Sequence, residues 1–201
     1  MDFYYDLITQ KSWKTLQELK KKYEFILIGG WAVFLYTKAL KSKDIDLVMG
    51  YEELEKLKGE FEVSKNERLR KYEARKEEME IDIYVPFYSN PGLPAEELKK
   101  FSTHLEGFEV VEKEILAILK QKALMERANT VKGRKDLADL VSLFQLEDFA
   151  WQKYKRIIDE YELKEYLKFI REVIRETREI EEIGLNVHQM ARFKKRILPL
   201  I

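Results

Sequence analysis

The sequence predicts an α+β fold in which a short mixed β-sheet flanked by helices precedes a helical C-terminal region. The spacing of hydrophobic residues along the chain supports this prediction. Up to about residue 110, apolar runs of strand length alternate with helical segments, and beyond it apolar residues recur at helical spacing. We therefore expect a catalytic core in residues 1–110 and a helical region in residues 111–201. Hydrophobic residues make up 45% of the chain, enough to fill a core.

Strands and helices alternate in the first part of the chain. The segments expected there, in order, are the strand EFILIGG, the helix WAVFLYTKAL, the strand DIDLVMG and the helix YEELEKLKGE. They are followed by FEVSKNERL and KYEARK as polar edge strands, MEIDIYVPF as a buried strand stopped by Pro86, and GFEVV as one more strand. Residues 89–94 are expected to form a loop.

The second part of the chain is expected to be helical. KEILAILKQKALMERA and KDLADLVSLFQLEDFA both carry apolar residues at helical spacing. An apolar stripe from Leu163 to Ile183 predicts one long amphipathic helix that Gly184 ends. This long C-terminal helix could pack on the preceding helices or form a homodimer, and packing within the chain is favoured because no strict heptad persists.

Composition excludes several classes of site. The chain has no Cys, which excludes disulfides, thiolate zinc sites and cysteine nucleophiles. Its only histidines, His104 and His188, are expected at the surface. Equal numbers of basic and acidic residues, 37 each, give no argument for nucleic acid. Since MDFYYDLITQ lacks a basic region followed by an apolar run, and no stretch is long enough to span a membrane, we expect a cytoplasmic protein.

Three aspartates are candidates for a metal site. Side chains alternate along a strand, so Asp44 and Asp46 project from one face with about 6–7 Å between their Cα atoms. A neighbouring strand can bring Asp82 to the same cluster, or Glu80, which shares its face. Converging carboxylates repel one another unless cations neutralise them, and Mg²⁺ prefers oxygen ligands together with substrate phosphates. The alternative is a solvated sheet face.

Two glycines follow the first predicted strand. Gly29 and Gly30 lie where a strand ends and a helix begins, and backbone N–H groups at such a position attract a phosphate. Without the nearby carboxylates, the same pair would indicate a plain tight turn. The glycine pair and the aspartates together favour a site for a nucleoside triphosphate and Mg²⁺ or Mn²⁺.

These residues resemble a known signature. The run FILIGGWAVFLYTKALKSKDIDLVM with the later EIDIYV resembles the nucleotidyltransferases of the DNA polymerase beta superfamily. GGWAV, the run from Ser42 to Asp46 and KQKALMERANTVKGRKDLADL are similar to the minimal nucleotidyltransferases of the AbiEii-type toxin and related uncharacterised families. The likeness covers roughly residues 20–146. It implies a nucleotidyltransferase fold and an enzyme that moves a nucleoside monophosphate from a triphosphate to a hydroxyl of tRNA, a small molecule or a protein, releasing pyrophosphate.

The resemblance also implies residue roles. Asp44 and Asp46 bind two metal ions, and Asp82 helps to bind one while it activates the acceptor hydroxyl. The residues implied in nucleotide binding are Gly29, Gly30, Ser42, Lys120, Lys122 and Lys135, with Arg127 and Arg134 as further candidates in the same helical stretch. The chain departs from many relatives in having Gly30, then Trp31, where those carry a hydroxyl residue after the first glycine.

Other interpretations remain open. A nucleotide-binding or toxin–antitoxin interaction protein can keep this fold without turnover, and acidic clusters also serve metal-dependent nucleases. In the helical region, Asp136 and Asp139 are expected to form ion pairs with Arg134 or Lys135.

Overall fold

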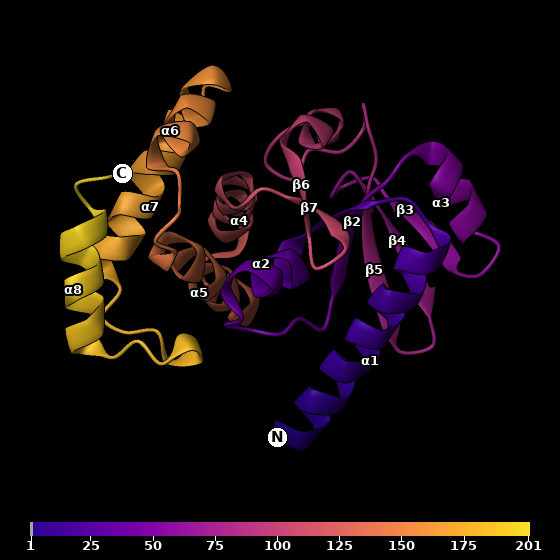
Figure 1. Ribbon diagram of the computed structural model, residues 1–201, viewed down its shortest axis with the longest axis horizontal. Coiled ribbons are helices and arrows are strands. Elements are labelled where there is room, and N and C mark those ends of the chain that lie inside the picture. The colour runs from indigo at the N-terminus through magenta and orange to yellow at the C-terminus, as the bar shows by residue number, and fades with distance from the viewer. Residues whose placement is uncertain (1) are drawn as a thin grey trace. The chain divides into compact units, whose positions relative to one another are not determined.

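The computed structural model describes residues 2–201, with side chains from Leu7 onward. The chain divides into two compact units, Met1–Glu112 and Lys113–Ile201. Helices and a mixed sheet occur together in the first unit, whereas the named elements of the second unit are all helices (Figure 1). The expected α+β fold is therefore confirmed.

One mixed sheet contains the seven strands found in residues 2–201 (Figure 1). They are β1 (Ile26–Ile28), β2 (Ile45–Val48), β3 (Glu62–Asn66), β4 (Lys71–Lys76), β5 (Met79–Tyr84), β6 (Ser102–Leu105) and β7 (Phe108–Val111). Their order in the sheet is β3-β4-β5-β2-β1-β7-β6. β2 pairs with β5, and β1 with β7, in parallel, whereas the other neighbours are antiparallel.

The first unit also contains helices. They are α1 (Asp2–Lys22), α2 (Gly29–Thr37), α3 (Tyr51–Leu57) and the short 3₁₀ helix η1 (Ala95–Phe101). The Trp31 Nε1–H of α2 donates to Ser12 Oγ of α1 at 2.8 Å. The Trp13 ring of α1 lies 4.9 Å from that of Trp31 and 5.7 Å from that of Phe108 on β7. Aromatic packing thus joins α1 and α2 to the sheet.

The two faces of the sheet differ in polarity. Leu27, Leu47 and Ile83 lie in register across β1, β2 and β5 and are fully buried. Their neighbours Asp46 and Asp82 point to the opposite face because side chains alternate along each strand. This alternation separates the hydrophobic core from the carboxylates.

The second unit is a set of helices. They are α4 (Lys113–Arg127), α5 (Val131–Gln145), α6 (Trp151–Glu160), α7 (Lys164–Glu176), the 3₁₀ turn η2 (Glu181–Ile183) and α8 (Val187–Ile197). Phe144 of α5 packs against Phe149, Trp151 and Tyr154, with ring centroids 4.9–5.8 Å apart. Tyr154 also donates a hydrogen bond to Gln121 of α4 at 2.8 Å, which ties α6 to the same core.

Two expectations about elements are wrong. The long helix predicted from Leu163 to Ile183 ends at Glu176, because Thr177 is extended and Ile180 then forms an isolated β-bridge with Leu185. Gly184 closes only the short turn η2. KYEARK is β4, which lies between β3 and β5 and not at an edge of the sheet.

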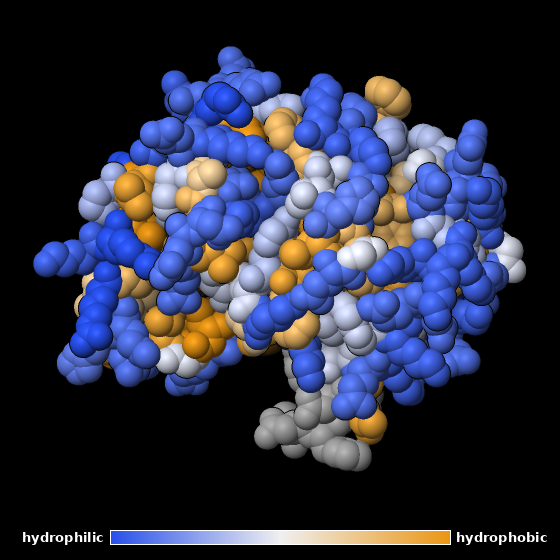
Figure 2. All heavy atoms as spheres, viewed as in Figure 1, coloured by the Kyte–Doolittle hydropathy of each residue, from blue (hydrophilic) through white to orange (hydrophobic). Residues whose placement is uncertain are grey.

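Hydrophilic residues cover most of the surface on the face seen in Figure 2. Among the helices of the described chain, none combines the length and the apolar character that a membrane crossing requires.

Candidate functional site

Asp46 and Asp82 are direct neighbours in the sheet. In the parallel pairing of β2 with β5, the Cα of Asp46 is in register with that of Asp82. Neighbouring strands lie about 4.8 Å apart, and paired residues point to the same face. Glu80, the alternative considered from sequence, is two residues further back and contacts Arg75, with 3.1 Å between Arg75 Nε and Glu80 Oε1. The register thus brings Asp82 to Asp46.

Gly29 lies directly against the Asp46 carboxylate. Ile28, the last residue of β1, pairs with Asp46, so the bend that follows β1 starts beside this aspartate. A Cβ atom on residue 29 would lie 2.0 Å from Asp46 Oδ2, and Gly29 has φ +67°. Only glycine combines this backbone conformation with this close approach. Gly30 and Trp31 follow as buried residues in the first turn of α2.

Asp82 is held by a lysine. Lys71 Nζ of β4 lies 2.5 Å from Asp82 Oδ2 and 3.4 Å from Glu73 Oε1. Burial raises the pKa of the Asp82 carboxyl, the Lys71 ammonium opposes that rise, and the charges of Glu73 and Asp44 add to it. The effect of Asp44 on Asp82 places Asp44 within electrostatic range of the pair. Ser42, which lies just before β2, is buried.

The donor set suits a divalent cation in its chemistry. Asp46 and Asp82 offer carboxylate oxygens on adjacent strands, and Asp44 is close enough to raise the pKa of Asp82. In the described part of the chain, no group of three or more His, Asp or Glu side chains is arranged around one metal position. Asp46 and Asp82 therefore form a pair to which phosphate or water would have to add the remaining ligands.

In the second unit, Lys120 lies inside a buried ionic cluster. Its Nζ is 2.7 Å from Asp139 Oδ2 and 3.2 Å from Asp136 Oδ1. Arg127 Nε donates to Asp136 Oδ2 at 2.7 Å. These contacts join α4 to α5, so two of the basic residues considered for the triphosphate also hold the helices together. Contact of Lys120 with a triphosphate stays a prediction.

The other predicted basic residues are more accessible. Lys122 is partly exposed and lies 3.9 Å from Glu126, one turn further along α4. Lys135, on α5, is partly exposed as well. Their predicted contact with nucleotide likewise stays a prediction.

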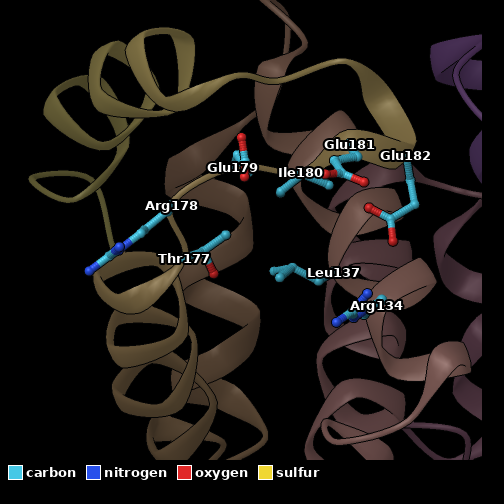
Figure 3. Close-up of a pocket in the computed structure, with 8 residues that line it drawn as sticks. All are labelled: Arg134, Leu137, Thr177, Arg178, Glu179, Ile180, Glu181 and Glu182. Carbon is cyan, nitrogen blue, oxygen red and sulfur yellow. The ribbon is translucent and has the colours of Figure 1, made fainter.

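Arg134 lines a hollow of about 350 Å³ within the second unit (Figure 3). Arg134 and Leu137 come from α5, and the other lining residues are the run from Thr177 to Glu182. Arg178 points away from the hollow in Figure 3. Because Glu179, Glu181 and Glu182 share the lining with Arg134, their carboxylates disfavour a triphosphate there.

Sequence reasoning missed Lys71. The signal was present in the two-residue connection between β4 and β5, Glu77 and Glu78, which fixes Glu73 opposite Asp82. That register, combined with side-chain alternation, places Lys71 on the face of Asp82. The histidines were expected at the surface, and both His104 and His188 are exposed.

No protein-family model and no curated protein matches this chain. A solved structure that resembles it is described as an antigenic nucleotidyltransferase-like protein from Paracoccidioides brasiliensis. That match covers 81% of this chain and 93% of the other, with 16% sequence identity and a TM-score of 0.40. A likeness at this level establishes nothing about the activity of this chain.

Proposed function

We propose that this chain is a metal-dependent nucleotidyltransferase that moves a nucleoside monophosphate from a nucleoside triphosphate to a hydroxyl acceptor. The observation that carries the proposal is the contact of the Asp46 carboxylate with the Gly29 bend, beside Asp82 on the adjacent strand. A carboxylate pair next to backbone N–H groups at the start of a helix combines ligands for a cation with donors for a phosphate.

The proposed reaction is a displacement at the α-phosphorus. Mg²⁺ or Mn²⁺ held by Asp44, Asp46 and Asp82 would neutralise charge on the attacking and leaving oxygens. Gly29 and Gly30 donate backbone N–H groups to the triphosphate. Asp82 accepts the proton of the acceptor hydroxyl. The bond from the acceptor oxygen to the α-phosphorus forms as the bond to the β-phosphate oxygen breaks, and pyrophosphate leaves.

Further parts of the proposal concern binding and context. Ser42 supports the aspartates, and Lys120, Lys122 and Lys135 supply positive charge for the triphosphate. The acceptor is tRNA or a small molecule, and the reaction takes place in the cytoplasm, where triphosphates are made. The proposal also includes a homodimer. The long helix first considered as its interface is interrupted after Glu176.

The test uses labelled triphosphates with Mg²⁺ and tRNA, protein or small-molecule extracts. We expect the wild-type chain to form a labelled product. Asp46→Asn should lower the rate by more than about 100-fold, the upper end of the loss seen when a group that only supports a metal ligand is changed. Glu80→Gln is the matched control, because Glu80 is exposed on the same face of β5 and should leave the rate unchanged.

Three results would contradict the proposal. Equal labelling by wild type and Asp46→Asn would remove the role of the carboxylates. Tight binding of triphosphate with no pyrophosphate release for any acceptor would indicate a catalytically silent nucleotide-binding or toxin–antitoxin protein. Release of nucleotides from RNA without any triphosphate would indicate a nuclease.

A further inference from the structure

We propose that the outer side of helices α7 and α8 binds the phosphate backbone of RNA. Four exposed basic side chains form this basic face, Lys168 and Arg175 on α7 with Arg192 and Lys195 on α8. The inference rests on the proposed function for the choice of RNA, because among the acceptors considered there it selects RNA over a small molecule.

Basic side chains recur along α7 at helical spacing. Lys164, Lys168, Arg171 and Arg175 follow one another at intervals of four, three and four residues, so they share one side of the helix. With a rise of 1.5 Å per residue, successive members lie about 4.5–6 Å apart along the helix axis. Such a row suits a polymer with regularly repeated negative charge, and a nucleic acid strand carries one phosphate about every 3.4 Å along a duplex.

The opposite sides of both helices are apolar and already packed. Ile170 and Ile174 of α7 are fully buried, and Met190, Phe193 and Ile197 of α8 are at most 4% exposed. A helix that lies on a membrane inserts its apolar face among the lipids, and here both apolar faces are packed inside the second unit. The exposed side of the two helices therefore presents charge, and not hydrocarbon, to a partner.

Two contacts fix α8 against α7. Lys194 Nζ donates to the carbonyl oxygen of Arg175 at 2.7 Å, and Arg171 Nη2 donates to the carbonyl oxygen of Ile201. Because the later residue Ile201 meets the earlier residue Arg171, the two helices run in opposite directions side by side (Figure 1). Basic side chains of both helices thus belong to one surface of the second unit.

Acidic side chains do not pair with the basic face. Lys168, Arg175, Arg192 and Lys195 have no ion-pair partner among the described residues. Residues 187–201, which include α8, contain four basic residues and no acidic one. Cations held side by side repel one another, and a polyanion relieves this repulsion while counterions are released. Although the charge of the whole chain is balanced, its distribution favours a polyanion here.

Helix α7 also carries acidic side chains, which limit the basic face on that helix. They are Glu165, Glu172 and Glu176. None of them forms an ion pair with Lys168 or Arg175 in the described chain. The basic face is therefore strongest on α8, where variants should have the largest effect.

The chemistry of the face favours RNA among polyanions. Arginine supplies two of its four side chains, and a guanidinium presents N–H donors in a planar fork that matches phosphate oxygens. Contacts to phosphate position a nucleic acid without reading its sequence. RNA carries a 2′-hydroxyl on every ribose, which DNA lacks, and the proposed reaction requires a hydroxyl acceptor.

The experiment measures binding of the full chain to a fluorescein-labelled RNA hairpin by fluorescence anisotropy as the KCl concentration is raised. Wild type should bind at low salt, and the logarithm of its binding constant should fall linearly with the logarithm of the salt concentration. The double variant Arg192→Gln with Lys195→Gln should bind more weakly. Its salt slope should be smaller by about two, one for each lost phosphate contact.

The matched control removes the same charge from the first unit. Lys14→Gln with Lys21→Gln changes two exposed lysines of α1 and should keep the wild-type slope. Circular dichroism and thermal unfolding check that both double variants are folded. An equal loss of binding in the control would show that only net charge matters, and would overturn the basic face.

A kinetic measurement links the face to the reaction. With RNA as acceptor and labelled triphosphate, the variant Arg192→Gln with Lys195→Gln should raise the KM for RNA and leave kcat and the KM for triphosphate unchanged. A change in kcat alone would overturn the role of the face in binding RNA. Labelling of a small molecule but not of RNA, or tighter binding of a DNA hairpin of the same sequence, would overturn the choice of RNA.

The remaining outcomes separate this inference from the proposed function. No binding of wild type to RNA at low salt, or binding to phosphatidylserine vesicles in place of RNA, would overturn the basic face and leave the nucleotidyltransferase in place. Salt-dependent RNA binding through the basic face, with no labelled product from any acceptor, would instead overturn the proposed function.

Discussion

The Asp46 carboxylate fills the space beside Gly29 that a Cβ atom would need. Residue 29 combines a positive φ of +67° with space that Asp46 fills completely, so any side chain there meets both a strained backbone and a collision. Asp46 and Asp82 could be placed on one face of the sheet from sequence because alternation along strands is a local property, whereas Asp44, expected on the same strand, lies just before β2. Lys71 could not, because its approach to Asp82 depends on the register of a hairpin.

Gly29→Ala should displace the Asp46 carboxylate and weaken Mn²⁺ binding. A Cβ atom would lie 2.0 Å from Asp46 Oδ2, and the left-handed conformation adds a cost of about 1–2 kcal/mol in stability. Mn²⁺ affinity and urea unfolding measure the two effects. Gly50→Ala is the matched control, because a Cβ at Gly50 meets nothing within 4 Å. Wild-type Mn²⁺ affinity in Gly29→Ala would show that Asp46 is not a ligand.

Helix α5 begins at a hydroxyl cap, Thr130. Thr130 Oγ1 accepts a hydrogen bond from the Gly133 N–H at 3.0 Å, which satisfies one of the free donors of the first turn. The start of α5 in turn positions Asp136 and Asp139 for Lys120 of α4. The cap therefore supports the buried ionic cluster of the second unit.

Thr130→Ala should destabilise the protein by about 1 kcal/mol, since the Gly133 N–H loses its acceptor. Urea unfolding followed by circular dichroism measures the change. Thr130→Ser retains the hydroxyl and should stay close to wild type. If the serine variant lost as much stability as the alanine variant, the hydrogen bond would not be the cause.

Elements with a strong apolar period could be predicted, and those without one could not. The strands β1 and β5 and the helices α4 and α5 follow from their patterns. Helix α1 was missed because Thr9 and Ser12, which belong to its buried face, are polar and weaken the apolar stripe. Strand β6 was missed because Thr103 and His104 are exposed at an edge of the sheet. The spacing of apolar residues within one segment cannot predict burial that depends on contacts with distant parts of the chain.

Across the whole chain, charge is balanced by many pairs near the surface. The pKa of Glu60 is lowered by hydrogen bonds from Lys22 and Tyr23, that of Glu78 by Lys11, and that of Glu73 chiefly by Asn66. A carboxyl with a lowered folded-state pKa adds stability above its ordinary value of 4.5. That stability is lost as the pH falls through the folded-state pKa. The contribution of Asp82 to stability changes with pH in the opposite direction. Because its pKa is raised, its ionisation lowers stability as the pH increases.

The free energy of unfolding should therefore decrease as the pH is lowered from about 5 to about 3, since several described carboxyls have a lowered pKa and only Asp82 has a raised one. Urea titrations across this range measure the slope. High salt should reduce the slope because it screens exposed pairs. A stability that stayed constant or increased on acidification would contradict this assignment.

Parallel pairing of β2 with β5 has a consequence for how the protein forms. Two parallel neighbours require a long crossover, and here α3, β3 and β4 lie between them in the chain. Asp46 and Asp82 can meet only after the intervening segment has returned the chain to the side of β2. Such pairing of residues far apart in sequence is slow in folding. A nascent chain that ends before Asp82 would carry Asp44 and Asp46 without their partner. Cations should accordingly slow unfolding of the finished protein and leave the early stages of refolding unaffected.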